Sequence, residues 1–258
     1  MHKITDKLCV VTGAAKSIGY GVAKRYAEAG ARVILLDINP EVLESAGKLC
    51  ELGYQARGYV ADITNKAAVD AVFKEIHRDF GAVYALANVA GVSSQNPIEE
   101  VTPEEWDKIM KVNVYGSFYC IQAVIDDMKK ARSGKIINFS SKSGKTGSAL
   151  MVPYSAAKGA VIAMTQAIAF EVAPYNININ CLCPGITDAT GVWDAVSAGY
   201  VKNLHMDKAQ VVDKFTAKVP LGRLTSIEDV VDFVEFLTVS GDYCTGQAFN
   251  ISGGREMH

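Results

Sequence analysis

The sequence predicts an α/β protein whose parallel β-sheet is covered by helices on both faces. Short apolar segments alternate with amphipathic segments along the whole chain, as strand–helix units do. The apolar segments are almost continuous, which is typical of strands buried on both faces of a parallel sheet. With 258 residues, 49% hydrophobic and 21% charged, the chain suits one globular domain, residues 1–258, and two smaller domains are the weaker alternative.

Each predicted element has local signals that mark its ends. The strands are predicted at residues 8–11, 32–36, 56–60, 83–87, 135–140, 177–183 and 248–251. The helices between them are predicted at residues 17–29, 40–52, 67–80, 103–132, 153–173 and 226–238. Glycines that suit a helix C-terminus follow the first three helices, at Gly30, Gly53 and Gly81. Thr102 and Pro103 are typical of an N-cap and of the first helical position, so they begin the long fourth helix.

The stretch from residue 187 to residue 219 has the weakest periodicity in the chain. It follows the sixth strand, and ligands of parallel sheets bind beyond the carboxyl ends of the strands. We therefore expect residues 187–219 to form a lid over the substrate. Polar residues are mixed with apolar ones in this lid, which suits a substrate with many hydroxyl groups. They are Asp188, Thr190, Asp194, Ser197 and Asn203.

Composition argues against several partners and locations. The net charge is −2 and the pI is about 6.1, so nothing indicates electrostatic binding to nucleic acid or to an anionic membrane. The chain has no run of about 18 apolar residues, and its first residues lack the apolar core of a signal peptide. The six cysteines are scattered, as free thiols in a reducing compartment are, and the four histidines lack metal-ligand spacing. We expect a cytoplasmic protein with a small-molecule substrate and no metal.

A glycine-rich turn follows the first strand and opens the first helix, as in dinucleotide sites. Gly13 permits the sharp turn, Gly19 lets the backbone approach a pyrophosphate, and Gly21 lets the helix pack closely. The helix begins near Ser17 and Ile18, and its N-terminus places a partial positive charge at the phosphates. The order strand, turn, helix therefore predicts cofactor contacts at Gly13, Ser17, Ile18 and Gly19.

Asp37, at the end of the second strand, favours NAD over NADP. A carboxylate at this place accepts hydrogen bonds from both hydroxyls of the adenosine ribose and repels a 2′-phosphate. Lys16, inside the glycine turn, is the contrary signal, because a cation there could pair with that phosphate. We give Asp37 more weight because it lies at the ribose itself; a solvated acid at a strand end is the alternative.

Three further strand ends are predicted to contact the cofactor. After the third strand, Asp62 and Ile63 offer a carboxylate and an adjacent N–H to the adenine. The fourth strand ends in a segment from Asn88 to Gly91, which we expect to form a wall beside the adenosine ribose. After the sixth strand, backbone N–H groups are expected to bind the nicotinamide carboxamide. This last segment consists of Pro184, Gly185, Ile186 and Thr187.

Tyr154 and Lys158 lie four residues apart in a predicted helix, so they share one face of it. An ammonium beside a phenol favours phenolate, which predicts that the pKa of Tyr154 falls from about 10 toward neutrality. Such a phenol is a suitable acid or base for alcohol and ketone chemistry. A lone pair of this kind is usually exposed and inert. Its register with Ser141, thirteen residues earlier, and with the glycine turn favours a catalytic role.

These motifs, in this order, resemble the short-chain dehydrogenase/reductase family over essentially the whole chain. They are the glycine turn, the segment 88–91, Asn113, Ser141, the pair Tyr154 and Lys158, and Pro184-Gly185. The resemblance implies an NAD(P)-dependent oxidoreductase acting on CH–OH groups, with a single-domain Rossmann fold of seven parallel strands. Members of this family are often homotetramers, so the resemblance also implies this assembly. Val89 replaces the second asparagine of the family's segment, which should matter little because Asn88 and Gly91 remain.

The same resemblance assigns roles to four residues. It makes Tyr154 the acid or base that exchanges a proton with the substrate oxygen. Lys158 then lowers the pKa of Tyr154 and hydrogen-bonds the nicotinamide ribose. Ser141 holds the substrate oxygen and stabilises developing charge. Asn113 binds a water that passes protons from Lys158 to solvent.

Some segments are similar to narrower groups within the family. Residues 141–148 and 243–247 are similar to segments of sorbitol-6-phosphate 2-dehydrogenases, and other polyol dehydrogenases and acetoin reductases are similar around residues 183–186. Lys142 and Lys145 are candidates for binding a sugar phosphate, with solvent-facing loop lysines as the alternative. Met151 and Trp193 are candidates for lining the pocket, although such side chains also pack as core.

Three functions are therefore considered. The leading one is an NAD-dependent dehydrogenase that interconverts a sugar alcohol, or its phosphate, and the ketose. The second, of the same class, is a reductase of acetoin, diacetyl or other small ketones. The third is a non-catalytic NAD(H)-sensing protein, against which the complete set of four reaction residues argues. The long helices 103–132 and 153–173 are expected to pair with their copies across a two-fold axis in a homotetramer.

Overall fold

Seven parallel strands form one sheet in the order β3-β2-β1-β4-β5-β6-β7, in a computed structural model that describes residues 4–188, 190, 193, 197, 201 and 207–257. The strands are β1 (Leu8–Thr12), β2 (Arg32–Asp37), β3 (Ala56–Val60), β4 (Ala85–Asn88), β5 (Gly134–Phe139), β6 (Ile177–Pro184) and β7 (Ala248–Ile251). This arrangement confirms the predicted single-domain Rossmann fold, and every strand lies within two residues of its predicted ends.

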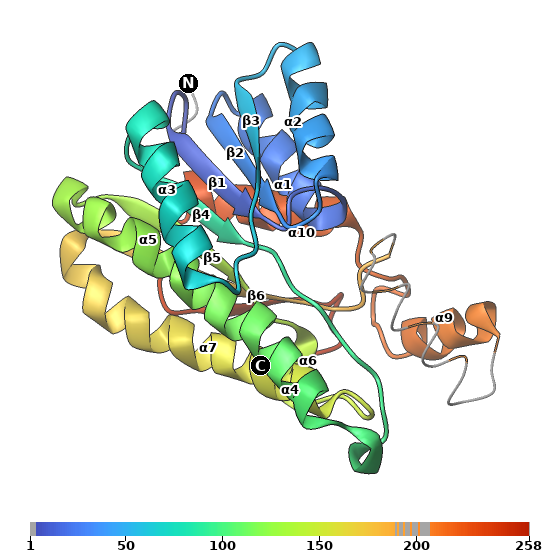
Figure 1. Cartoon of the computed structure of the whole chain (residues 1–258). Helices are drawn as coiled ribbons and strands as arrows, with labels where there is room; N and C mark the ends of the chain where they lie inside the picture. The colour runs from blue at the N-terminus through green and yellow to red at the C-terminus, as the bar shows by residue number, and fades with distance from the viewer. Residues whose placement is uncertain are drawn as a thin grey trace.

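Helices cover both faces of the sheet (Figure 1). One face carries α1 (Ser17–Glu28), α2 (Glu41–Glu51) and α10 (Ile227–Val239). The other face carries α3 (Lys66–Phe80), α5 (Gly116–Ala131) and α7 (Val152–Val172). Successive strand side chains point to opposite faces, so Val11 packs in the first core and Val10 in the second. This double burial explains why the strand segments are almost entirely apolar.

The strand order reverses beside β1, and this reversal positions the site. β1 pairs with β2 on one side and with β4 on the other, so the chain leaves the sheet in opposite directions from neighbouring strands. In open parallel sheets a ligand binds at such a switch point, beyond the carboxyl ends of the strands. Thr12 and Asn88 are paired at these carboxyl ends, directly before the glycine turn and the segment 88–91.

The predicted helix 103–132 is present, but a wide turn interrupts it. It consists of α4 (Pro103–Met110), a π-helical turn η2 (Lys111–Tyr115) and α5. Asn113 lies at the centre of this turn, and its side-chain amide donates to the carbonyl of Ile109 at 2.9 Å. π-turns inside helices are frequent at functional sites because they change the direction of one side chain. The sequence prediction missed this turn because an apolar pattern does not distinguish it from α-helix.

Within the part of the chain that the structure describes, four short elements were also missed. They are η1 (Ile98–Glu100), α6 (Lys142–Thr146), η3 (Ala173–Tyr175) and α9 (Lys208–Thr216). The last of these lies in the stretch 187–219, where only a weak pattern was seen. Its start is marked by a reciprocal cap between Asp207 and Gln210, a signal too short to be found by periodicity. In Figure 1, α9 lies to one side of the sheet.

One helical segment is long and apolar enough to cross a membrane by length and composition. It runs over Val152–Tyr175, with a mean hydropathy of 1.3. The segment contains α7, which packs against β5 and β6 and buries Ala157, Val161 and Val172. It is therefore one of the helices that cover the sheet. The predicted cytoplasmic location stays a prediction.

Candidate active site

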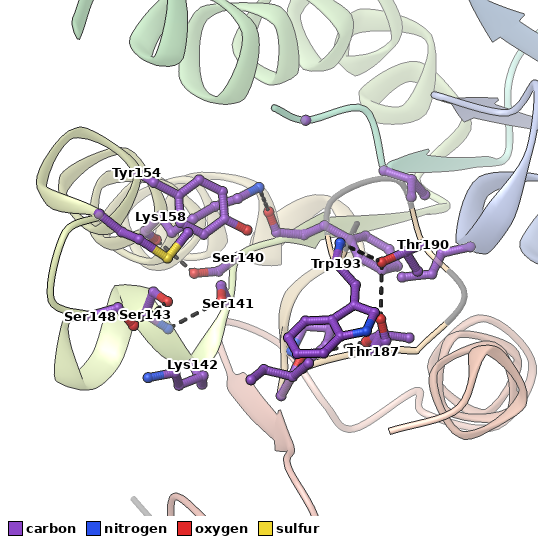
Figure 2. A pocket seen from close by; sticks show the side chains of 18 of the residues that line it. Ser140, Ser141, Lys142, Ser143, Ser148, Tyr154, Lys158, Thr187, Thr190 and Trp193 are labelled. Atoms are coloured by element: carbon purple, nitrogen blue, oxygen red, sulfur yellow. Dashed lines mark hydrogen bonds between the residues drawn. The ribbon is translucent and has the colours of Figure 1, made fainter. Parts of the chain in front are cut away.

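A cavity of about 150 Å³ lies beyond the carboxyl ends of β4, β5 and β6. Tyr154 and Lys158 reach it from α7, and Ser141 from the end of β5. Figure 2 shows Tyr154, Ser141 and Trp193 around this space. Trp193 and Phe215 come from the stretch 187–219 and pack edge to face, with ring centroids 6.2 Å apart. The structure thus brings residues that are far apart in the sequence to one cavity.

The first two turns of α7 place Tyr154 and Lys158 side by side, as their spacing predicted. Both side chains are buried, and Lys158 Nζ lies 5.5 Å from the centroid of the Tyr154 ring. The Lys158 ammonium donates a hydrogen bond of 2.7 Å to the carbonyl of Phe139 at the end of β5. This bond fixes the lysine beneath the tyrosine, between α7 and the sheet.

Burial is the largest influence on the pKa values of Tyr154 and Lys158. It raises the pKa of Tyr154 to about 12, although a hydrogen bond with Ser141 lowers it. Burial also lowers the pKa of Lys158 to about 8. The prediction that the pKa of Tyr154 falls toward neutrality is therefore wrong for the protein alone, because the sequence does not show how completely both groups leave water. Near neutral pH the tyrosine is a phenol, ready to donate its proton.

Ser141 caps the short helix α6, and a close helix contact fixes its position. Its hydroxyl oxygen accepts from Ser143 N at 3.1 Å. Beside it, Ser140 donates to the carbonyl of Lys158 at 2.7 Å, which ties the end of β5 to α7. Gly144 permits this approach, because a Cβ there would lie 2.6 Å from the carbonyl carbon of Lys158. These contacts hold Ser141 and Tyr154 in register.

Asn113 and Gly91 complete the wall beside Lys158. The Asn113 side chain donates to the carbonyls of Val92 at 2.8 Å and Ile109 at 2.9 Å. Its buried Oδ1 has no hydrogen-bond partner among the described residues. A Cβ at Gly91 would lie 2.7 Å from this Oδ1 and 3.3 Å from Lys158 Nζ, so only glycine fits. An unpaired buried acceptor beside the lysine is what the predicted water contact of Asn113 requires.

The glycine turn has the shape that a pyrophosphate needs. Gly13 has φ of +66°, and a Cβ there would lie 2.7 Å from Ala90 Cα. A Cβ at Gly19 would lie 2.1 Å from the carbonyl oxygen of Gly13, so the turn closes on itself without room for side chains. Helix α1 begins at Ser17 directly after this turn. The donors of its first turn and the bare backbone fit the phosphates of a dinucleotide.

Asp37 lies beside this turn, as predicted. One carboxylate oxygen accepts from Ala15 N at 3.0 Å, and the other accepts from Asn39 N at 2.9 Å. These bonds hold the carboxylate at the end of β2, and each oxygen keeps a lone pair for a ribose hydroxyl. Lys16 is exposed at the N-cap of α1. Asp37, which favours NAD, and Lys16, which favours NADP, therefore both lie at the glycine turn.

The predicted cofactor residues after β3 and at the end of β4 make different contacts. Asp62 accepts from the backbone and the hydroxyl of Thr64, both at 2.8 Å, and Ile63 packs against Gly116. The Asn88 side chain points into the protein, where it donates to Asn138 Oδ1 at 2.9 Å. The Asn88 side chain therefore links β4 to β5. Only the backbone of the segment 88–91 can then contact the ribose.

The segment after β6 lines the cavity and also hydrogen-bonds to β7. Pro184, Gly185, Ile186 and Thr187 all line the cavity. However, Gly185 N donates to the carbonyl of Ile251 at 2.9 Å. This N–H is used by the sheet, so carboxamide binding stays a prediction for the amides of Ile186 and Thr187.

The protein-family model described as "short chain dehydrogenase" matches residues 7–200. The chain belongs to the short-chain dehydrogenase family. It is 32% identical over 257 residues to galactitol 2-dehydrogenase of Agrobacterium fabrum, with 99% of each chain covered. It is 35% identical over 253 residues to a diacetyl reductase ((S)-acetoin forming) of Staphylococcus epidermidis, covering 96% of this chain and 98% of that one.

Solved structures place this short-chain dehydrogenase in the same family. The structure of NAD⁺-bound xylitol dehydrogenase superposes with a TM-score of 0.92 at 33% identity, covering 98% of this chain and 100% of that one. The protein is thus an NAD(P)-dependent oxidoreductase acting on CH–OH groups, as predicted.

The predicted substrate residues of this dehydrogenase are only partly brought together. Lys142, Met151 and Trp193 line the cavity. Lys145 instead donates to the carbonyl of Ala248 on β7 at 2.6 Å and lies outside the cavity lining. Asp194 and Asn203 of the predicted polar lid lie outside the described residues, as do residues 189, 191–192, 195–196, 198–200, 202 and 204–206.

Sequence reasoning did not identify several side chains at the cavity. Phe139, Ser148 and Phe215 line it beside the predicted residues, and Thr190, predicted as a polar residue of the lid, lines it as well. Thr190 accepts from Trp193 N at 3.1 Å and donates to the carbonyl of Thr187 at 3.0 Å, so it positions the indole. The spacing of Val211 and Phe215, which are buried on one side of α9, was the one signal that could have indicated a helix covering the site.

Proposed function

We propose that this protein is an NAD-dependent dehydrogenase that interconverts a sugar alcohol, or a sugar-alcohol phosphate, and its ketose. The observation that carries the proposal is the convergence of Ser141, Tyr154 and Lys158 on one cavity beside the glycine turn. Similarity to a galactitol dehydrogenase and to a xylitol dehydrogenase supports a polyol as substrate. Similarity to a diacetyl reductase supports the second candidate, reduction of small ketones.

In this proposal Ser141 and Tyr154 both contact the substrate oxygen, and each has a different role. Ser141 donates a hydrogen bond to that oxygen and holds it beside Tyr154. During ketone reduction the Tyr154 phenol donates its proton to the oxygen, and during alcohol oxidation the phenolate accepts it. The dinucleotide, when bound, supplies or accepts the hydride, and its oxidised form brings a positive charge that favours phenolate. Lys158 and Asn113 connect the tyrosine to a water that exchanges protons with solvent.

The choice of NAD over NADP is proposed to rest on Asp37. Asp37→Ser removes the acceptor for two ribose hydroxyls and the charge that repels a 2′-phosphate. Because a hydrogen bond to a charged group contributes about 1.5–3 kcal/mol, the ratio of kcat/KM for NAD to kcat/KM for NADP should fall about 10- to 100-fold. Steady-state assays with both cofactors measure this ratio.

Glu41→Gln is the matched control, because Glu41 is an exposed carboxylate four residues further along the chain. It should leave the cofactor ratio unchanged. A wild-type enzyme that prefers NADP, or an Asp37→Ser variant with an unchanged ratio, would contradict this assignment.

A phosphate on the substrate is proposed to bind at Lys142. Its ammonium is partly buried at the cavity, and its pKa is lowered by burial and then by the nearby charges of Arg255 and Lys218. Arg255 is already paired with Glu256 at 3.3 Å, so Lys142 and Lys218 are the two cations that favour an anionic group here. Lys142→Gln should therefore raise KM for a hexitol phosphate about 10- to 100-fold and leave KM for the free hexitol within about two-fold.

Lys145→Gln is the control for this prediction, since Lys145 donates to a backbone carbonyl outside the cavity lining. Initial rates with a hexitol and its phosphate, measured for wild type and both variants, separate the possibilities. Turnover confined to unphosphorylated polyols would remove the phosphate from the proposal and keep the polyol.

Three further predictions stay proposals. The stretch 187–219 is proposed to act as a lid, which the positions of Trp193 and Phe215 at the cavity support.

The protein is proposed to be a homotetramer that pairs through η2, α5 and α7. Exposed aromatic side chains on the outer faces of these helices, Tyr115, Phe118 and Phe170, support this pairing. The NAD(H)-sensing alternative would be favoured by NAD binding without turnover of any substrate in a broad panel of alcohols and ketones.

A further inference from the structure

Residues 252–256 fold into a turn that follows β7. Arg255 N donates to the carbonyl of Ser252 at 3.2 Å, and Glu256 N donates to Ser252 Oγ at 3.1 Å. From β7, Asn250 Nδ2 donates to the carbonyl of Glu256 at 3.0 Å. These bonds fix the turn at the carboxyl end of the sheet, which is the end where the cavity lies.

This turn is packed tightly against the segment that follows α9. Gly253 and Gly254 both have positive φ, +62° and +91°. A Cβ at Gly253 would lie 2.6 Å from Val219 Cγ1, and a Cβ at Gly254 would lie 2.9 Å from Pro220 Cγ. Leu221 N also donates to the carbonyl of Gly253 at 3.1 Å. The turn therefore supports the end of the stretch that contains α9.

Arg255 extends from this turn to the ring of Phe215 on α9. Its guanidinium carbon lies over the ring, 5.4 Å from the centroid. The Arg255 side chain is 14% exposed, and its Nε pairs with Glu256 Oε1 at 3.3 Å. A cation at this distance over an aromatic face is attracted by the ring, and more strongly where water is excluded. The carboxylate of Glu256 holds the guanidinium in this position.

Phe215 lies between Arg255 and the candidate active site. It lines the cavity of about 150 Å³, and together with Arg255 it lines a small neighbouring cavity of about 10 Å³. Its ring packs edge to face with Trp193, at a centroid distance of 6.2 Å. Phe215 and Trp193 belong to the same apolar cluster as Tyr154 and Met151. Contacts therefore connect Arg255 to the wall of the cavity that holds the reacting groups.

We propose that Arg255 is a positioning residue, which holds Phe215 and Trp193 against the cavity and so determines how tightly a substrate binds. The inference rests on the proposed function in taking this cavity as the substrate site, and it applies to a polyol and to a small ketone alike. A wall that is held in place in advance binds substrate with a smaller loss of conformational entropy. Because Arg255 acts on the ring of Phe215, its removal should weaken the binding of neutral and charged substrates equally.

Direct binding of an anionic substrate by Arg255 is the alternative. Arg255 is close enough to Lys142 to lower the pKa of that lysine. However, Arg255 lies outside the lining of the larger cavity, and its charge is balanced by Glu256. These observations favour an action through Phe215, and a comparison of neutral and phosphorylated substrates distinguishes the two roles.

The first test is Arg255→Met, which removes the charge and keeps a long apolar side chain. It should raise KM about 3- to 30-fold, the range that a cation–π contact supports, and leave kcat within about two-fold. The probes are a hexitol, its phosphate and 2,3-butanediol, and KM should rise equally for each of them that wild type turns over. Arg255→Lys keeps a cation for the ring and should restore most of the affinity. Arg78→Met, at an exposed arginine on α3, is the matched control and should match wild type.

A double-mutant cycle tests whether the effect passes through the ring. Phe215→Leu removes the aromatic face and should itself raise KM. In the Phe215→Leu background, Arg255→Met should raise KM by less than about two-fold further, since no aromatic face remains for the cation. Independent effects of the two substitutions would multiply, and that result would overturn the positioning role.

Trp193 provides a measurement that does not need turnover. The chain has two tryptophans, of which Trp106 is 38% exposed and Trp193 is 3% exposed. In a Trp106→Phe background, the emission of Trp193 should therefore lie at short wavelength and be protected from quenching by acrylamide. Arg255→Met should shift this emission to longer wavelength and increase the quenching, whereas Arg255→Lys should leave both close to wild type.

The outcomes separate the positioning role from the proposed function. A rise in KM for the phosphorylated substrate alone would show direct anion binding and overturn the positioning role. Unchanged emission of Trp193 in Arg255→Met would overturn it too, as would a loss of kcat together with NADH binding, which indicates general damage. If wild type turned over none of the probes, the proposed function would fail, and the emission of Trp193 would still decide whether Arg255 positions the wall. Equal rises in KM, non-additivity with Phe215→Leu and a shifted emission would support the role.

Discussion

Tyr154→Phe should lose turnover by at least about 10²- to 10⁴-fold, the usual contribution of a positioned acid or base. The substitution removes only the hydroxyl that exchanges a proton with the substrate oxygen. The aromatic ring remains buried beside Met151 and Trp193, so the shape of the cavity is kept. NADH should bind as tightly as it does to wild type. The measurements are kcat with the best substrate and a fluorescence titration with NADH.

Tyr243→Phe is the control for this substitution, because Tyr243 is fully exposed on the surface. It should have wild-type kcat. If Tyr154→Phe kept most of its rate, Tyr154 would not be the acid or base, and the proposed mechanism would need another proton donor. Loss of both turnover and NADH binding would indicate damage to the site and would not count as support.

Lys158→Met should abolish turnover and also change how stability depends on pH. Lys158 has its pKa lowered by burial to about 8 from a usual value of 10.5. Between these two pH values the unfolded chain binds a proton that the folded protein does not, so this residue makes the free energy of unfolding rise with pH. The rise from pH 8 to pH 10.5 is on the order of 3 kcal/mol, and Lys158→Met should remove it.

Urea unfolding at several pH values between 7 and 10 measures this slope. Other groups titrate in the same interval, so the quantity to compare is the difference between wild type and variant. Lys24→Met is the control, because Lys24 is an exposed lysine on α1 and should leave the slope unchanged. A slope in Lys158→Met equal to that of wild type would show that this ammonium is not desolvated as the structure indicates.

The contrast between Tyr154 and Lys145 shows how far spacing predicts a site. Tyr154 and Lys158 lie on one helix, so their separation of four residues already determines that they share a face. Lys145 lies on the short helix α6, and its direction depends on where β7 passes. The sequence cannot show that strand beside it, and Lys145 donates to the carbonyl of Ala248 on β7.

The pKa of Tyr154 was mispredicted for a related reason, since burial is a property of the surroundings and the spacing shows only the nearest charge.

The sequence by itself determined the order of strands and helices, the glycine turn and the pair Tyr154 and Lys158. These features depend on local patterns of apolar residues and on neighbours within a few positions of the chain. Only the tertiary structure decided the π-turn at Asn113, the direction of Lys145 and the desolvation of Tyr154 and Lys158. Each of these depends on contacts between segments far apart in the chain, because burial and partner choice are set by what packs against a residue.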